Sequence, residues 1–184
     1  MNIHYRKAAM CLDQGGVIAY PTEAVWGLGC DPWDVHAVAR LLELKQRDPA
    51  KGLIVIAGTL QQVEPWLANL SAAQQATLKA SWPGPRTWLV PDVRIAPPWV
   101  RGEHASIALR VSDHPVVQGV CAAFGGPMVS TSANPAGKAP ARNALEVRRY
   151  FGAALDTIVP GETGGLDRPT EIRDLLTGEI ARHG

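Results

Sequence analysis

Cysteine is scarce in this 184-residue sequence, and Cys11, Cys30 and Cys121 lie far apart. An odd number of cysteines without C-x-x-C spacing predicts neither a disulfide framework nor a cysteine metal site, and it suits a reducing compartment. No apolar run approaches the roughly 20 residues that span a bilayer, and no apolar signal core follows Arg6 and Lys7. We therefore expect a soluble cytoplasmic protein without membrane contact.

An excess of charge of one sign is also missing, since 18 Lys and Arg residues face 17 Asp and Glu residues. Any nucleic-acid affinity must then come from a local patch. The five histidines show no metal-ligand spacing, and neither a G-x-S-x-G elbow nor a complete phosphate-loop motif occurs. No protein-bound metal site is expected. An enzyme with this sequence would work by positioning and charge stabilisation.

Short runs of buried-type residues alternate with amphipathic segments along the chain. The pattern predicts strands near 17–20, 52–57, 87–90, 107–111, 128–131 and 157–159, and a hairpin over 171–182. Helices are expected over 4–14, from Asp31-Pro32 to Lys45, twice within 60–82, over 115–124 and from Asn143 to Gly152. Residues 91–103 look like an irregular surface loop. We predict one α/β domain over residues 1–184 with a mixed sheet.

The stretch that organises the chain is Val129 to Asn134, where a buried-type strand ends in hydroxyls and an amide. Ser130, Thr131, Ser132 and Asn134 offer polar groups where α/β sheets bind ligands, beyond a strand's carboxyl end. Turning backbone amides there would also suit an anion. A hydroxyl-rich turn that satisfies only itself remains the alternative.

Two cations, Lys45 and Arg47, come directly after a strongly apolar helical segment and are separated by Gln46. Alternate residues of an extended segment point the same way, so both cations could face one anion, and a lysine with an arginine suits a polyphosphate. Compensation of the helix C-terminal dipole is the simpler interpretation. We expect both side chains on the surface.

Three further features favour a ligand site. Residues 20–29 place a proline, Thr22, Glu23 and glycines after a strand, as ligand loops do. Arg110 lies within an apolar strand, where a charge must be paired or point into a site. The segment from Ser81 to Thr87, with two prolines and Arg86, could form a stiff wall against a planar base, although it could equally be a simple strand entry.

Taken together and in this order, these segments resemble the YrdC/TsaC family of threonylcarbamoyl-AMP synthases, most closely its short bacterial members. The resemblance runs nearly from end to end. It rests on AYPTEAVWGLGCD (19–31), LELKQR (42–47), WPGP (82–85), STSAN (130–134), VPGETGG (159–165) and PTEIRD (169–174).

The resemblance implies a twisted α/β fold of mixed parallel and antiparallel strands, flanking helices and a concave basic cavity. It also implies conversion of L-threonine, bicarbonate and ATP, with Mg²⁺, to threonylcarbamoyl-AMP and pyrophosphate for tRNA modification. Downstream transfer proteins of the TsaB, TsaD and TsaE type and a tRNA contact are implied partners. Lys45 and Arg47 would be catalytic through the phosphates. Nucleotide contacts are implied for Lys45, Arg47, Thr87, Ser132 and Asn134, and threonine contacts for Thr22, Arg110, Thr131 and Thr170.

Some positions depart from the family pattern. Ile56 stands where many relatives have a histidine, Ala136 replaces a common serine, and Thr170 stands where serine is frequent. An RNA-binding or ribosome-maturation factor without catalysis remains an alternative, because Lys138, Arg142, Arg148 and Arg149 gather near the site. A solvated helix face is the favoured explanation of those cations. Carbamoyl transfer of the hydrogenase-maturation type is a third hypothesis, although there the related domain belongs to a much larger chain.

Overall fold

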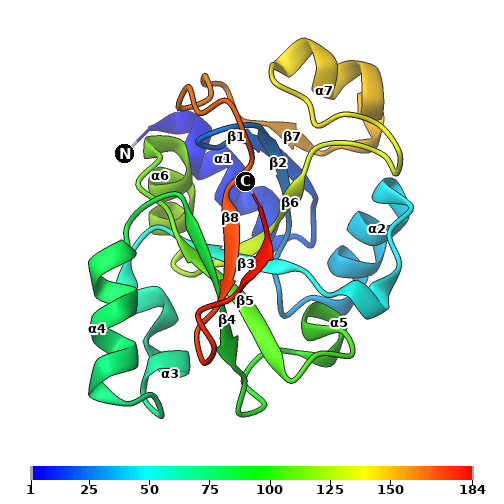
Figure 1. The fold of residues 1–184 in the computed structure, drawn as a ribbon. Coiled ribbons are helices and arrows are strands. Elements are labelled where there is room, and N and C mark those ends of the chain that lie inside the picture. Colours follow the sequence, from blue (N-terminus) through cyan, green and yellow to red (C-terminus); the bar gives the residue numbers. More distant parts are fainter. Residues whose placement is uncertain (1, 184) are drawn as a thin grey trace.

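The computed structural model describes residues 2–183, which are built around one sheet of nine strands (Figure 1). The strand order is β7-β1-β2-β6-β3-β5-β4-β8-β9. The pairs β1–β7, β3–β5 and β4–β8 are parallel and the others antiparallel, which confirms the predicted mixed α/β sheet. The strands are β1 (Ile18–Pro21), β2 (Trp26–Gly29), β3 (Ile54–Ala57), β4 (Arg86–Pro91), β5 (Ser106–Val111), β6 (Met128–Ser132), β7 (Thr157–Ile158), β8 (Glu171–Asp174) and β9 (Ile180–Arg182).

The helices begin close to where the capping signals predict them. Asn2 and Asn143 cap α1 and α7 by accepting backbone N–H bonds, which satisfies donors that a helix start leaves free. The predicted start at Asp31-Pro32 is wrong, because Asp34 caps the helix there and Asp31 only closes the preceding turn. The helices are α1 (Ile3–Asp13), α2 (Val35–Lys45), α3 (Glu64–Leu67), α4 (Ala72–Ser81), α5 (Pro98–Arg101), α6 (Pro115–Phe124) and α7 (Ala144–Phe151).

One face of the sheet is only half covered. Helices α1 and α6 pack together over it and bury side chains such as Ile56 and Met128. Side chains alternate along a strand. Ile54 is two residues from Ile56 on β3, and Ser130 is two residues from Met128 on β6, so both lie on this same face. They line a hollow rather than the apolar layer. A polar cavity at the end of β6 occupies this open half.

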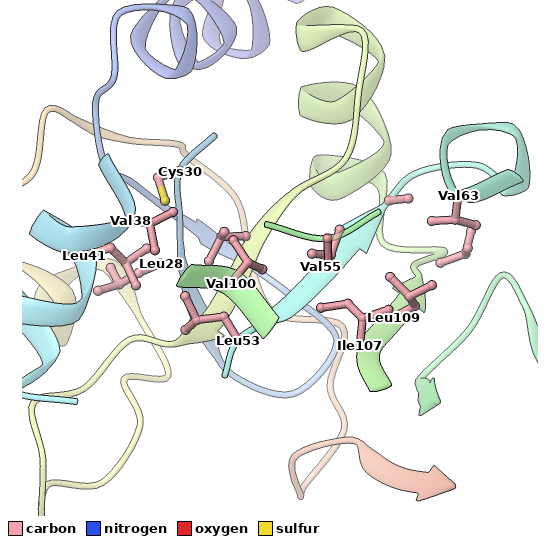
Figure 2. Packing of buried hydrophobic residues seen from close by; sticks show 14 of the residues in the cluster. Leu28, Cys30, Val38, Leu41, Leu53, Val55, Val63, Val100, Ile107 and Leu109 are labelled. Atoms are coloured by element: carbon pink, nitrogen blue, oxygen red, sulfur yellow. The ribbon is translucent and has the colours of Figure 1, made fainter. Parts of the chain in front are cut away.

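The opposite face carries the larger apolar core (Figure 2). Strand residues Val55, Ile107 and Leu109 meet side chains from α2 and from the segments beside α3 and α5. Helix α5 corrects the sequence prediction for residues 91–103. That segment contains a helical turn, and Val100 is fully buried in the core, so it is not a surface loop throughout. Within residues 2–183, every helix falls short of the length and apolarity that a bilayer crossing requires.

Residues 159–170, called the strap here, run without regular structure from β7 to β8. The strap lies along the turn between β1 and β2. Gly164 N donates to Thr22 O and Leu166 N to Glu23 O, both at 3.0 Å. Gly161 passes so closely that a Cβ there would lie 2.9 Å from both Pro21 and Val116. The strap therefore delivers Thr170 to the open half of the sheet.

Candidate functional site

Polar side chains converge where β6 ends, and two hollows meet there. The Arg110 compartment has a volume of about 220 Å³ and is also lined by Thr22 and Thr170. The Arg47 compartment has a volume of about 190 Å³ and is walled by β3, β4 and β5. Since both compartments share one wall, a ligand can extend from one into the other. The shared residues are Ser130, Thr131, Ser132 and Arg182.

The lining of the cavity is strongly one-sided in charge. Among the described residues that line either compartment there is no Asp or Glu. A hollow lined by positive charges concentrates a positive electrostatic potential and attracts anions. This arrangement agrees with the concave basic cavity that the family resemblance implies. The lysine and arginine residues in the lining are Arg47, Lys51, Arg101, Arg110 and Arg182.

The end of β6 is held in a fixed turn by its own side chains. Ser132 Oγ donates to Asn134 Oδ1 at 2.6 Å, and Asn134 Nδ2 donates to Pro135 O and Lys138 O. Ser132 lines both compartments, whereas Asn134 stands behind the turn and lines neither. The structure thus places Ser132 to contact a ligand directly and Asn134 to shape the turn.

Lys45 is the last residue of α2 and its side chain is buried, with a residue exposure of 5%. Its Nζ donates to the carbonyl oxygens of Ser132 and Asn134 and lies 3.5 Å from Asn134 Oδ1. Burial, with a smaller contribution from Arg47, lowers the pKa of Lys45 to about 8. The expectation of a surface lysine is therefore wrong. Lys45 holds the turn from behind and lines neither compartment.

Arg47 does reach the cavity, but by another route than the extended K-x-R segment that we expected. Gln46 adopts a left-handed conformation at the end of α2, which turns the chain sharply between the two cations. The Arg47 guanidinium donates to Gly52 O at 2.9 Å and lines the Arg47 compartment. Burial lowers its pKa. Lys45 and Arg47 therefore approach the site from different sides of the β6 turn.

Arg182 is a site residue that the sequence did not single out. It lies on β9, lines both compartments, and donates from Nη2 to Thr170 O at 2.9 Å. Partial burial and the nearby positive charge of Arg47 both lower the pKa of Arg182. Two arginines that repel each other across a hollow favour an anion between them.

Arg110 lies on β5 and is 6% exposed. It forms an ion pair with Glu23 through Nη2 and donates from Nη1 to Thr170 Oγ1 at 3.1 Å. Burial lowers the pKa of Arg110 to about 10, so the guanidinium is charged at neutral pH. The structural ion pair and the position in a site, which the sequence left as alternatives, occur together.

The remaining predicted residues divide into two groups. Thr22 and Thr131 line the Arg110 compartment, and Thr22 Oγ1 donates to Val25 O at 2.7 Å. Thr87, on β4, is completely buried, lines neither compartment and leaves its hydroxyl without a hydrogen-bond partner among the described residues. The structure thus does not bring Thr87 to the predicted nucleotide site. Ile56 also lies outside the cavity, in the apolar layer under α1 and α6.

No cluster of three or more His, Cys, Asp or Glu residues suited to a metal ion occurs in the described part of the chain. What the lining offers instead is cations, hydroxyls and backbone groups. The fold and the cavity thus define an α/β protein with two joined compartments whose basic lining suits an extended anionic ligand.

The chain belongs to the family whose model is named Sua5_yciO_yrdC and described as "Telomere recombination", which matches residues 10–184. It is 59% identical over 182 residues to the threonylcarbamoyl-AMP synthase of Cellvibrio japonicus, covering 99% of this chain and 96% of the relative. It is 62% identical over 175 residues to that of Chromohalobacter salexigens, covering 95% and 94%. The suspected family resemblance is confirmed.

A solved structure described as P. abyssi Sua5 complexed with L-threonine matches with a TM-score of 0.88 and 27% identity. The match covers 96% of this chain and 52% of that one, so this chain corresponds to about half of the longer protein.

Proposed function

We propose that this protein is a threonylcarbamoyl-AMP synthase, which forms threonylcarbamoyl-AMP and pyrophosphate from L-threonine, bicarbonate and ATP for tRNA modification. The observation that carries the proposal is the pair of joined compartments, with five cations and no carboxylate among their described lining residues. Such a lining suits two substrates that each carry anionic groups, the carboxylate of threonine and the phosphates of ATP, and that must meet. The threonylcarbamoyl-AMP synthases that are similar over nearly the full chain support the same activity.

The Arg110 compartment is the proposed site for L-threonine. Its about 220 Å³ suits a small amino acid, and Arg110 supplies a buried cation for the carboxylate. Thr22, Thr131 and Thr170 add hydroxyl or backbone groups around it. The structural relative with bound L-threonine, although only 27% identical, supports an amino-acid site in this fold.

The Arg47 compartment is the proposed site for the ATP phosphates. Arg47 and Arg182 would bind phosphate oxygens, which relieves the repulsion between the two guanidinium groups. Ser132 would donate from the β6 turn at the junction. Lys45 acts through that turn and through its charge, and Asn134 acts by holding the turn.

Mg²⁺ would enter as part of the ATP substrate. The lining supplies hydroxyls such as Ser130 and Ser132 but no carboxylate among its described residues. The phosphate oxygens and water would therefore provide most of its ligands, as is common for magnesium. When bound, the ion neutralises phosphate charge.

The chemistry requires positioning more than a protein nucleophile. The threonine amine combines with bicarbonate to give a carbamate and water. A carbamate oxygen then attacks the α-phosphorus of ATP, and pyrophosphate leaves. The shared wall at Ser130–Ser132 lies where an acceptor held by Arg110 and phosphates held by Arg47 would approach each other. Holding two reactants in line can supply a large share of a rate enhancement.

The wider setting of the reaction is also part of the proposal. We place the enzyme in the cytoplasm as one domain over residues 1–184, with transfer proteins of the TsaB, TsaD and TsaE type using its product. A tRNA contact is supported by cations at and beside α7, of which Lys138, Arg142, Arg148 and Arg149 are exposed. The same patch is the feature that favours the alternative of a non-catalytic RNA-binding factor.

The test follows pyrophosphate release by the purified protein with ATP and magnesium, with and without L-threonine and bicarbonate. Release that needs both substrates supports the synthase, and Arg47→Ala should lose most of it. Salt-sensitive tRNA binding without turnover would favour the RNA-binding alternative instead.

A further inference from the structure

Glu23 is a buried carboxylate next to the cavity that the proposed reaction does not use. It lies in the turn between β1 and β2, is 6% exposed, and does not line either compartment. Glu23 Oε1 accepts a 2.6 Å hydrogen bond from Ser112 Oγ, and Oε2 forms the ion pair with Arg110. A buried charge with partners on both oxygens has a defined orientation.

Arg110 is held from two sides as a result. Glu23 engages Nη2, Thr170 Oγ1 accepts from Nη1, and Nε has no hydrogen-bond partner among the described residues. Arg110 and Thr170 face the Arg110 compartment, whereas Glu23 stands behind the guanidinium. The guanidinium is therefore fixed by its surroundings. Nε and Nη2 are buried, which leaves Nη1, beside Thr170 in the compartment lining, to meet a ligand.

The neighbours of Glu23 also hold its carboxylate in place, as Glu23 and Thr170 hold the Arg110 guanidinium. Ser112 is fully buried, and its Oγ also accepts from His114 N at 3.1 Å, so the hydroxyl is locked between two groups. The backbone of Glu23 is bound to the strap, because its carbonyl accepts from Leu166 N at 3.0 Å. A Cβ on Gly164 would lie 3.1 Å from Glu23 Cα, so strap and turn are in close contact.

We propose that Glu23 is the positioning residue of the amino-acid site, which orients the Arg110 guanidinium so that its Nη1 group, beside Thr170, meets the carboxylate of the amino-acid substrate. This inference rests on the proposed function, because it deepens the role of the Arg110 compartment. Without its counter-ion the guanidinium would be free to turn toward other acceptors. A hydrogen bond from Nη1 to a carboxylate depends on the orientation of the planar guanidinium.

The test measures the KM values for L-threonine and for ATP in Glu23→Gln and Glu23→Asp. The first variant removes the charge, and the second keeps it but draws the carboxylate back by one methylene. Glu64→Gln is the matched control, because Glu64 is exposed on α3 and lines neither compartment. We expect the KM for threonine to rise by about tenfold in both Glu23 variants, as for the loss of one ionic hydrogen bond. The KM for ATP should stay within about twofold.

The double variant Glu23→Gln with Arg110→Gln shows whether Glu23 acts through Arg110. It also leaves no unpaired buried charge, so its folding does not depend on the pair. The KM for threonine should then equal that of Arg110→Gln alone. Additive effects in the double variant would overturn the inference, as would equal changes in the two KM values or an unchanged KM for threonine in folded Glu23→Asp.

Failure of the proposed function is a separate outcome. If the wild type binds L-threonine in calorimetry but releases no pyrophosphate, the synthase proposal fails and the threonine Kd replaces KM in the same comparison. A tenfold weaker Kd in Glu23→Asp would then still support the positioning role, and an unchanged Kd would refute it. A wild type that binds no L-threonine would overturn both.

Discussion

The buried ammonium of Lys45 makes nucleotide binding sensitive to mildly alkaline pH. Lys45 Nζ joins the carbonyl oxygens of Ser132 and Asn134 behind the turn that faces the cavity. Burial lowers its pKa from 10.5 to about 8, so the ammonium is lost over a range where surface lysines stay charged. We expect ATP to bind more weakly as pH rises through this range, because the cavity loses a positive charge and the turn loses its ionic anchor.

The size of the effect follows from the protonated fraction. With a pKa of about 8, about three quarters of the molecules carry the ammonium at about pH 7.5, and about one in eleven does at about pH 9. If only the protonated form binds ATP, the apparent Kd rises by about eightfold over this interval. Lys45→Met should bind ATP weakly and without this pH dependence.

The free energy of unfolding should change with pH in the opposite direction to ATP binding. The folded pKa of Lys45 is lower than its unfolded value, so between about 8 and 10.5 the folded state binds fewer protons than the unfolded state. The contribution of Lys45 to the free energy of unfolding therefore rises with pH through this window. The lowering corresponds to on the order of 3 kcal/mol.

Isothermal titration calorimetry with ATP at a series of pH values, on the wild type and Lys45→Met, is the assay. Urea unfolding of both proteins at the same pH values gives the stability half of the prediction. A wild-type ATP Kd that stays constant from about pH 7.5 to about pH 9 would refute the reasoning, since it would mean that the charge of Lys45 does not reach the nucleotide.

Three further substitutions test individual residues of the cavity. Arg182→Ala should raise the KM for ATP by about fivefold, as expected for one partly exposed ionic contact, and an unchanged KM in steady-state kinetics would remove Arg182 from the phosphate site. Ser132→Ala should weaken ATP binding by about 1 kcal/mol, so an unaltered calorimetric titration would contradict a contact from Ser132. Thr87→Val should leave the KM for ATP unchanged and raise the free energy of unfolding by up to about 1 kcal/mol, because it removes a buried hydroxyl that has no partner. Impaired ATP binding in that variant would restore the nucleotide role predicted for Thr87.

Much of the fold is predictable from the sequence because its signals are local. Capping residues such as Asn143 bind backbone within the same turn, so helix starts depend on few neighbours. Strand candidates follow from short apolar runs, and the hairpin over 171–182 from the Thr177-Gly178 turn. The start of α2 was misjudged because Asp31 and Asp34 both suit a cap, and only packing decides between them.

The candidate site is less predictable, because its residues meet through pairings that no local signal specifies. Arg182 reaches the cavity only because β8 pairs in parallel with β4, which carries the C-terminal hairpin across the sheet. The separate approaches of Lys45 and Arg47 depend on the left-handed turn at Gln46, a residue type with no special preference for that conformation. The ion pair of Glu23 with Arg110 joins residues far apart in the chain, and the sequence could show only that Arg110 needed a partner.

The position of the cavity follows from a change of side-chain chemistry along single strands. On one face of β6, Met128 lies under α1 and α6, and Ser130 two residues later lines both compartments. On the same face of β5, Ala108 and Arg110 line the hollows, while Ile107 and Leu109 fill the core behind. Because a strand exposes alternate residues to one face, the apolar positions fix the sheet in place, and the polar positions among them become the floor of the site. The stability of the core and the geometry of the cavity are thus set by the same strands, so a substitution that shifts β5 or β6 by one residue would destroy both.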